Sequence, residues 1–452
     1  MASETAEKQA TDRRATSDVM HIPGEGGLPV LGLLPELLRD PRGLRSRMQR
    51  EYGPVFRSRA LGQWTVNLTG VDGLQYVMQD KDHNFSSAQG WDLTIGRLFR
   101  RGLMLLDFDE HRLHRRMMQA PFKRDALEHY LVSMHDVCRE TMARWAQQPD
   151  FRGYPAIKQL TLDNAAVAFL GIDLDDDADA LNTAFVDTVA ASLAPIRVSI
   201  PGLAYHRGLK GRALLDTFFR TRIDARKSST SQDMFTLLCQ ATTDTGASFS
   251  DDDIVNHMIF LLMAAHDTVT SSLTTALHGL AANTQWQERL REEHASLGDG
   301  PLTFDDLDKL EQTGWLFNEA LRMWGPVPLI PRRAQRSFQF AGHDIPANTQ
   351  IAISPDSAHY DPSVWSEPLR FDPERFSAER AEHKRHPFAF VPYGGGAHKC
   401  IGMRFAEILA KVVLREFLQR FDARLPHGYE LAMQPLPIPK PKDGLPLQLI
   451  SR

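Results

Sequence analysis

The sequence has few cysteines, no long apolar run and no surplus of either charge. Its 452 residues include only three cysteines, Cys138, Cys239 and Cys400, which are far apart and form no Cys-x-x-Cys pair. This pattern excludes a disulfide framework and a structural zinc site, and it is typical of the reducing cytoplasm. The longest apolar run, Met258 to Ala265, is far shorter than the ~20 residues of a membrane-spanning helix. We therefore expect a cytoplasmic protein with no membrane anchor.

The charge balance argues against nucleic acid as a partner. The chain has 52 Lys and Arg residues and 57 Asp and Glu residues, which gives a formal net charge of -5. Because a nucleic-acid-binding protein requires a basic surplus to contact phosphates, we expect no nucleic-acid partner. An apolar fraction of 42% is sufficient for a large core, which excludes a disordered chain.

The chain is predicted to form a single domain preceded by a short tail. Residues 1–20 are mostly polar and charged, and the Arg13-Arg14 pair is not followed by the apolar stretch of an export signal. We predict a disordered tail there. No repeat, low-complexity tract or Gly/Ser linker divides residues 21–452, which we expect to form one domain.

The spacing of apolar residues predicts a mainly α fold with a small β subdomain. Apolar side chains recur at three and four residues in Asp251 to Leu280 and in Phe405 to Phe421, which is the spacing of amphipathic helices. Alternation typical of strands is confined to short pieces, such as Val55 to Leu68 and Ser337 to Ser354. Because these strands come from an early and a late segment, we expect one small sheet to join both halves of the chain.

The most informative segment runs from Phe388 to Glu407 and places a cysteine after three glycines, in Tyr393-Gly394-Gly395-Gly396-Ala397-His398-Lys399-Cys400-Ile401-Gly402. A sulfur at the N-terminus of the following helix is stabilised as a thiolate, which can serve as an axial iron ligand. The glycines allow the loop to turn and lie close to a flat partner, and Gly402 removes a side chain beside the sulfur. On these residues alone two alternatives stay open: a buried structural cysteine, and a cysteine nucleophile with His398 as its base.

This segment resembles the cysteine-ligand loop of cytochromes P450, whose pattern is aromatic-Gly-x-Gly-x-basic-x-Cys-x-Gly. An aromatic residue other than the usual Phe fills the first position. The resemblance implies the cytochrome P450 fold over residues 21–452, haem b as the cofactor and Cys400 as the ligand of its iron. The loop residues implied to surround the haem are Tyr393, Gly394, His398 and Gly402, with Gly396 completing the pattern.

Two further motifs of the family follow in the expected order. The first, Ala264-Ala265-His266-Asp267-Thr268, is similar to the oxygen-activation motif, in which the first Ala lies against the haem and the acid and the alcohol deliver protons. The hydroxyl of Thr268 is expected to bond the carbonyl of Ala264, four residues back. The second motif resembles a structural network behind the cysteine loop, formed by Glu319, Arg322 and Arg375.

The two propionates of a haem need cationic partners. The segment Asp109 to Arg116 looks like the family helix in which a His and an Arg four residues apart reach one propionate. The residues that match are His111 and Arg115, and their spacing places them on one helix face. The remaining candidates are Arg332, preferred by register, and His398.

The resemblance implies a haem-thiolate monooxygenase, which inserts one atom of dioxygen into an organic substrate and reduces the other to water. The chain leaves no room for a flavin or iron-sulfur module, so we expect electrons from a separate ferredoxin and ferredoxin reductase, or from a flavodoxin-type donor. Beside the cysteine, Lys399, Arg404 and Lys411 are expected to form a basic docking face. By contrast, Arg112 and Arg116 are expected to be merely solvated.

An apolar pocket with few polar anchors suits a bulky lipophilic small molecule. We expect a steroid or a terpenoid as substrate, with a fatty acid as the alternative. Two other classes stay open, a non-catalytic haem-binding protein and a cysteine hydrolase. The candidate pocket residues are Trp91, Leu93, Ile95, Phe99, Leu103, Phe260, Ala264, Val327, Leu329, Leu436 and Ile438.

Overall fold

The computed structural model describes residues 19–172, 176–192, 194 and 197–452. Most of the predicted tail, residues 1–18, lies outside this part of the chain. Val19, the first described residue, is 1% exposed and belongs to a core cluster with Ile22 and Val55. The predicted start of the domain at residue 21 stays a prediction.

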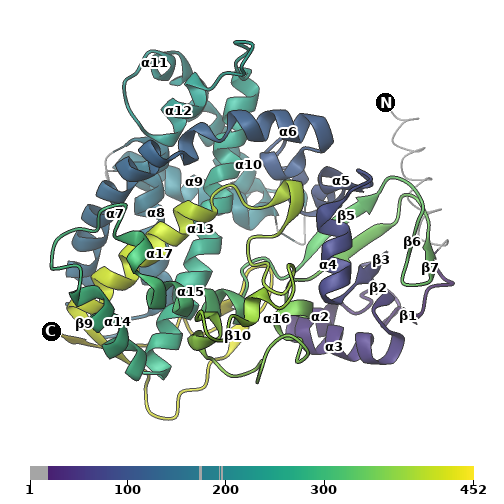
Figure 1. Cartoon of the computed structure of the whole chain (residues 1–452). Coiled ribbons are helices and arrows are strands. Elements are labelled where there is room, and N and C mark those ends of the chain that lie inside the picture. The colour runs from purple at the N-terminus through teal and green to yellow at the C-terminus, as the bar shows by residue number, and fades with distance from the viewer. Residues whose placement is uncertain (1–18, 173–175, 193, 195–196) are drawn as a thin grey trace.

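Helices fill most of the molecule, and the strands of the main sheet gather at one side of it (Figure 1). The helices of the first half are α2 (Leu34–Arg39), α3 (Pro41–Tyr52), α4 (Gly70–Gln79), α5 (Ser87–Trp91), α6 (Phe108–Met117), α7 (Arg124–Trp145), α8 (Gly153–Ala165), α9 (Asp176–Ser192) and α10 (Ala204–Arg220). Those of the second half are α11 (Ile223–Lys227), α12 (Met234–Gln240), α13 (Asp251–Ala282), α14 (Gln285–Ala295), α15 (Glu311–Met323), α16 (Asp356–His359) and α17 (Met403–Arg420). Short 3-10 and π turns include η1 (Asp92–Gly96), η2 (Leu103–Leu105), η6 (Pro373–Phe376) and η8 (Gly396–His398).

Both helices predicted from apolar spacing are present. The first, α13, starts after Ser250, whose hydroxyl accepts the N–H of Asp253 and caps the free end of the helix. The second, α17, ends at Arg420, and Phe421 already belongs to a strand. Within the described residues, no helix combines the length and the apolar character needed to cross a membrane.

The main sheet has six strands in the order β1-β2-β3-β8-β5-β4. As predicted, it joins an early and a late segment, because β3 pairs in parallel with β8 through Val66 and Ile351. The six strands are β1 (Gly24–Glu25), β2 (Val55–Ala60), β3 (Gln63–Leu68), β4 (Phe85–Ser86), β5 (Ile330–Ala334) and β8 (Gln350–Ile353). Two-stranded sheets pair β6 (Phe338–Phe340) with β7 (His343–Ile345), β9 (Phe421–Arg424) with β12 (Gln448–Ser451), and β10 (Met433–Gln434) with β11 (Lys440–Pro441).

The largest core cluster lies among the helices and holds the elements of the candidate site. It includes buried residues of α7, α8, α13, α15 and α17, and α13 packs against α8, α15 and α17. A second cluster, with Val66, Met78 and Phe388, lies between the sheet and α4. The cysteine loop runs along the boundary between these two clusters, so both cores fix its position.

Candidate functional site

The cysteine loop is held in a tight turn against α4. The backbone N–H of Cys400 donates to the carbonyl of Tyr393 at 2.9 Å. Within the turn, Gly394 and Gly396 have φ of 68° and 61°, in the left-handed region that favours glycine. A Cβ on Gly396 would lie 1.8 Å from the carbonyl oxygen of Met78, so a side chain at this position is excluded.

The glycine after the sulfur has little protein around it. A Cβ on Gly402 would meet only a ring carbon of Phe122 at 3.7 Å, an ordinary contact, so its predicted place against a flat partner stays a prediction. Its backbone N–H faces the sulfur of Cys400 and, with Arg115, lowers the pKa of the thiol. The surrounding protein acts in the opposite direction, and this burial is the larger effect, so the pKa is raised overall.

The surface next to the sulfur fits a flat group inside the fold. Cys400 has an exposed side chain although protein atoms surround it closely enough to raise its pKa. In the middle of α13, an otherwise buried helix, Ala264, Ala265 and Thr268 are also only half-buried. Since α13 and α17 pack against each other, these open surfaces on neighbouring elements fit the predicted haem between them.

A cluster of two histidines and two arginines lies beside the loop. The rings of His111 and His398 stack with centroids 3.9 Å apart, and Arg115 and Arg332 are close enough to lower the pKa of both histidines. Among the described residues, none of the four has a carboxylate partner at ion-pair distance. Burial, the largest effect, lowers the pKa of Arg332 to about 10, of His111 to about 4 and of His398 to about 2. Two arginines and two neutral histidines of this kind offer hydrogen-bond donors and positive charge that fit the two propionates of haem.

The arginine that follows Arg332 in the sequence, Arg333, has a different partner. Arg333 donates to the carbonyl of Asn348 at 2.9 Å, whereas Arg332 is close to His398. This agrees with the preference for Arg332 that the register indicated.

The polar pair of α13 has the local geometry expected for it. The hydroxyl of Thr268 donates to the carbonyl of Ala264 at 2.7 Å, which confirms the predicted bond and loosens the helix there. The carboxylate of Asp267 lies 3.1 Å from Nδ1 of His266 and is 14% exposed. Burial raises the pKa of Asp267, but His266, Lys158 and Lys440 together outweigh it, and the pKa is lowered. The aspartate is therefore ionised at neutral pH and ready to take a proton.

The predicted charge network is complete and fully buried. Glu319 accepts from Nε and Nη2 of Arg322 at 2.7 and 2.8 Å, and from Nε of Arg375 at 3.0 Å. All three side chains are 0% exposed. Such bidentate, charge-assisted bonds orient both guanidiniums and hold the segment from α15 to η6 in one geometry.

Sequence reasoning missed two members of this network. The carbonyl of His359 accepts from Arg322 at 2.7 Å, and its ring Nε2 accepts the N–H of Val391, at the start of the cysteine loop, at 3.0 Å. The second member, Glu382, lies 3.3 Å from Arg375. Neither belongs to a motif, and a lone His after a short strand carries no signal that distinguishes it from any other buried histidine.

The tyrosine that replaces the usual phenylalanine of the loop has an unusual hydroxyl. Among the described residues, the hydroxyl of Tyr393 is buried without a hydrogen-bond partner. Burial, the charge of Glu407 and the sulfur of Cys400 all raise the pKa of this phenol. The group is therefore neutral, and it places a dipole close to the sulfur.

The candidate pocket residues divide into two groups. The side chain of Leu93 lies outside the described part of the chain. Buried members of the large core are Ile95, Phe99, Leu103 and Phe260. Half-buried members, which leave apolar surface open, are Trp91, Ala264, Val327, Leu329, Leu436 and Ile438.

Three contacts bring the segments of this pocket together. A Cβ on Gly90 would lie 2.7 Å from the backbone of Arg332, so α5 packs directly on β5. A Cβ on Gly102 would lie 2.3 Å from the ring of Phe260, which places residues 99–103 against α13. The hydroxyl of Ser271 donates to the carbonyl of Pro439 at 2.6 Å and ties the turn after β10 to α13, one helical turn beyond the polar pair.

Comparisons with known proteins agree with this geometry. The family model described as cytochrome P450 matches residues 22–445. A putative cytochrome P450 136 of Mycobacterium tuberculosis is 40% identical over 99% of this chain and 92% of its own length. The taxoid 7-beta-hydroxylase of Taxus cuspidata is 26% identical over 95% of this chain and 89% of its own length.

A solved structure shows the same fold. The retinoic acid-bound cyanobacterial CYP120A1 superposes with a TM-score of 0.86 at 27% identity, covering 95% of this chain and 99% of its own. A family match over nearly the whole chain, on a fold shared to this extent, shows that the chain belongs to the cytochrome P450 family, whose members are haem b monooxygenases.

Proposed function

We propose that this monooxygenase oxidises a bulky isoprenoid, a terpenoid or a steroid, with Cys400 as the ligand of the haem iron. The observation that carries the proposal is the half-buried apolar surface formed by Trp91, Val327, Leu329 and Leu436. These side chains come from segments that pack on β5, through Gly90 and Arg332, and on α13, through Ser271 and Pro439. A surface that is apolar and open inside the fold binds lipophilic ligands by removing both from water.

The residues of the chain have separate tasks in this proposal. Haem supplies the binding and reductive activation of dioxygen. His111, Arg115, Arg332 and His398 hold the propionates, and the loop carries the sulfur. Thr268 and Asp267 hold and move the protons that the reaction consumes, with the carboxylate recharging the hydroxyl.

The named relatives support the isoprenoid class. Taxoids and retinoic acid are both isoprenoids. They appear in the names of two proteins that align with almost the whole of this chain. The pocket also offers one polar donor, since Nε1 of Trp91 is buried without a partner among the described residues. We propose that this N–H binds an oxygen of the substrate.

Electrons are proposed to come from a ferredoxin or flavodoxin-type donor that binds the face around the cysteine loop. Two of the docking residues that the sequence indicated already have partners within the protein. Arg404 binds Asp308 at 2.8 Å and Lys411 donates to the carbonyl of Leu307 at 2.5 Å, so both are engaged within the protein. Of the three expected residues, only Lys399 has an exposed side chain.

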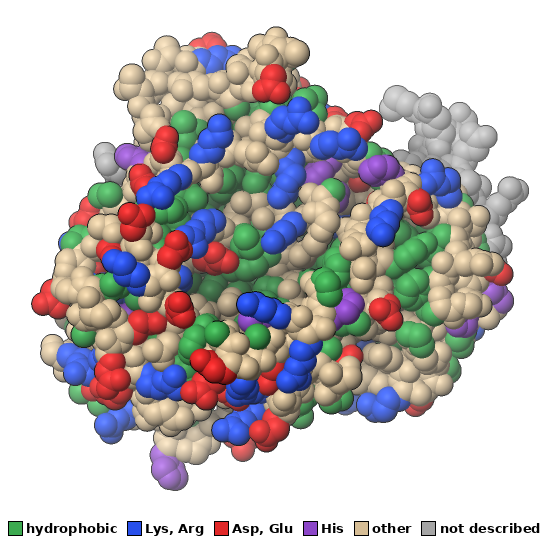
Figure 2. Space-filling model, in the orientation of Figure 1, with side chains coloured by type: hydrophobic (Ala, Val, Ile, Leu, Met, Phe, Trp, Pro, Cys, Tyr) green, Lys and Arg blue, Asp and Glu red, His purple; other side chains and the backbone are tan. Residues whose placement is uncertain are grey.

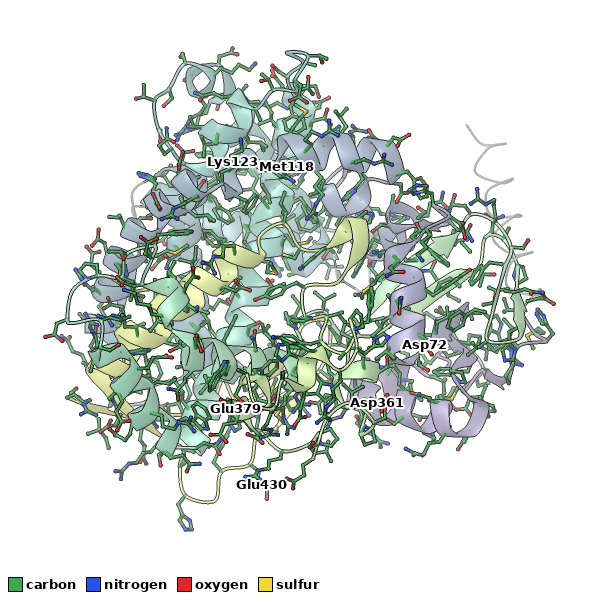
Figure 3. The ribbon with its side chains drawn as sticks, viewed as in Figure 1. Asp72, Met118, Lys123, Asp361, Glu379 and Glu430 are labelled. Carbon is green, nitrogen blue, oxygen red and sulfur yellow. The ribbon has the colours of Figure 1, made fainter. Side chains whose placement is uncertain are left out.

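Other cations complete this basic face. Arg112 and Arg116, expected only to be solvated, are 60% and 63% exposed on α6, the helix whose His111 stacks on the loop. They lie 3.0 Å from Asp109 and 4.0 Å from Asp244, and such exposed pairs are weak enough for a partner to replace. Lys123 is exposed at the start of α7, close to the end of α6 (Figure 3). Figure 2 shows Lys and Arg side chains over this part of the molecule. A cytoplasmic location, which the three unpaired cysteines favour, would give access to such donors.

The substrate class can be tested by binding titrations. The holoenzyme is titrated with a diterpenoid, retinoic acid, a steroid and a long-chain fatty acid, and the spin-state change of the haem is recorded. We expect saturable changes with isoprenoids and a weaker change in the Trp91→Phe variant for ligands that carry an oxygen at the bound end. A response to the fatty acid alone would contradict the isoprenoid proposal.

The proton-transfer roles can be tested by measuring coupling. Thr268→Ala should increase the fraction of reducing equivalents released as peroxide at the expense of product, because the hydroxyl next to the reaction site is lost. Thr274→Ala is the matched control, since Thr274 lies on the same helix and bonds the carbonyl of Thr270 in the same way at 2.7 Å. Equal coupling in both variants would remove Thr268 from the proton path.

A further inference from the structure

One histidine of α13 is buried with no hydrogen bond to either ring nitrogen. Among the described residues, Nδ1 and Nε2 of His266 both lack a hydrogen-bond partner, and the side chain is 1% exposed. Unpaired polar groups at this depth are costly, so a structural histidine would normally be paired. Nδ1 lies 3.1 Å from Oδ1 of Asp267, close enough for a bond after a small rotation. The other nitrogen, Nε2, points to a missing partner.

A small cavity lies beside this ring. His266 lines it together with Asn182 of α9, Phe185, which meets the imidazole edge-on at 5.5 Å, and Leu262. About 10 Å³ of the cavity is open to the centre of a water molecule, close to the minimum that one buried water needs. Asn182 is half-buried, whereas Leu262 and Phe185 are buried, so the polar side of the cavity is also the side nearer to solvent.

We propose that a water molecule in this cavity, bound between Asn182 and His266, forms with the imidazole a proton path from α9 to Asp267. His266 is then a positioning and proton-carrying residue behind the polar pair of α13. This inference rests on the proposed role of Asp267 and adds the group that recharges it.

The transfer balances in protons alone. The cavity water, once protonated from solvent, gives one proton to Nε2 of His266, and the proton on Nδ1 passes to the carboxylate of Asp267. The imidazole is neutral before and after, with its proton moved from one nitrogen to the other. It resets when Nε2 returns its one proton to the water and Nδ1, after the ring rotates about Cβ–Cγ, takes one proton up from the same water. No oxidant or reductant is needed.

Other charged groups also face the carboxylate and offer a rival path. Lys158 of α8 and Lys440 of β11 lower the pKa of Asp267, and the carboxylate in turn raises the pKa of the Tyr154 phenol. Lys440 lies 5.7 Å from the ring of Tyr154. If protons entered here, the two lysines and not His266 would govern transfer.

The hydrogen bond is tested first, without turnover. Protein labelled with ¹⁵N-histidine is studied in its reduced, carbon monoxide-bound form, and the His266 ring signals are assigned as those absent from His266→Gln. We expect Asp267→Asn to shift these signals, because the partner of Nδ1 changes, and Asn182→Leu to shift Nε2. Unchanged His266 signals in both variants would overturn the proposal.

The proton path is tested by coupling and by the solvent isotope effect. His266→Gln should lower product formation about tenfold, less than the ~100-fold typical of losing a general acid–base group, because Asp267 and Thr268 remain. It should also raise the solvent isotope effect. His278→Gln, on the same helix but with its ring tilted against that of Tyr429, is the matched control and should change neither.

The outcomes separate this inference from the function on which it rests. If Thr268→Ala increases peroxide release and His266→Gln does not, only the water path fails. If Lys158→Met and Lys440→Met slow transfer while His266→Gln has no effect, protons enter on the lysine side and the proposal is overturned. If Thr268→Ala also leaves coupling unchanged, the proposed role of the polar pair fails as well.

Discussion

The buried charge network behind the cysteine loop makes a quantitative prediction. Glu319→Gln keeps the shape of the side chain but removes the negative charge that faces Arg322 and Arg375, both 0% exposed. Breaking a buried ion pair by changing one partner costs about 3–5 kcal/mol. An unfolding entropy of ~2.1 cal/mol/K per residue gives ~1 kcal/mol per degree for a chain of 452 residues. We therefore expect the Tm to fall by about 3–5 °C.

The matched control is an exposed carboxylate that also binds an arginine. Glu374 is 49% exposed and pairs with Arg289 at 2.6 Å, so Glu374→Gln should cost less than about 1 kcal/mol. Both variants are compared by thermal unfolding and by the reduced carbon monoxide spectrum. Since His359 links the network to the loop at Val391, Glu319→Gln should also lose the long-wavelength band of the thiolate complex sooner. A Tm and a band lifetime equal to those of the control would refute this reasoning.

Three other changes have clear expected outcomes. Gly396→Ala should abolish haem retention, because its Cβ would lie 1.8 Å from the carbonyl oxygen of Met78. The control, Gly394→Ala, meets no atom closer than 3.9 Å and should cost only backbone strain of ~1 kcal/mol. The haem content of the purified variants distinguishes them. Burial lowers the pKa of His257 to about 3, so below about pH 6.5 the unfolded chain gains a proton that the folded chain does not. The free energy of unfolding should therefore decrease as the pH is lowered from about 6.5 to about 3. In urea titrations, His257→Gln should reduce this slope by up to ~1.4 kcal/mol per pH unit. Arg332→Leu should weaken haem binding about 10- to 150-fold, because one buried charge-assisted bond worth ~1.5–3 kcal/mol is lost. Haem transfer to apomyoglobin measures this, and unchanged transfer would remove Arg332 from the propionate site.

Local patterns in the sequence predicted the elements well. The spacing of apolar residues located α13 and α17 to within three residues, because an amphipathic helix buries one stripe whatever it packs against. The bond from Thr268 to Ala264 joins residues one turn apart, so the motif alone determines it. The stacking of His111 on His398, in contrast, is a tertiary contact that only the family resemblance had brought together.

The features that the sequence did not indicate all depend on tertiary neighbours. Lys411 is engaged because the carbonyl of Leu307 lies within reach, and no feature around Lys411 in the sequence encodes that approach. His266 stands between two recognised motif positions, yet its lack of partners depends on how α9 packs over it.

The parallel pairing of Val66 with Ile351 has a consequence for synthesis on the ribosome. At translation rates of about 5–20 residues per second, the hairpin of β2 and β3 waits roughly 15 to 60 s before β8 emerges. During that interval its outer strand has an unpaired edge, which is the surface that a second nascent chain can bind. The newborn chain is therefore at greatest risk of self-association before its last quarter has left the exit tunnel, and a chaperone that covers this edge would raise the yield of folded protein.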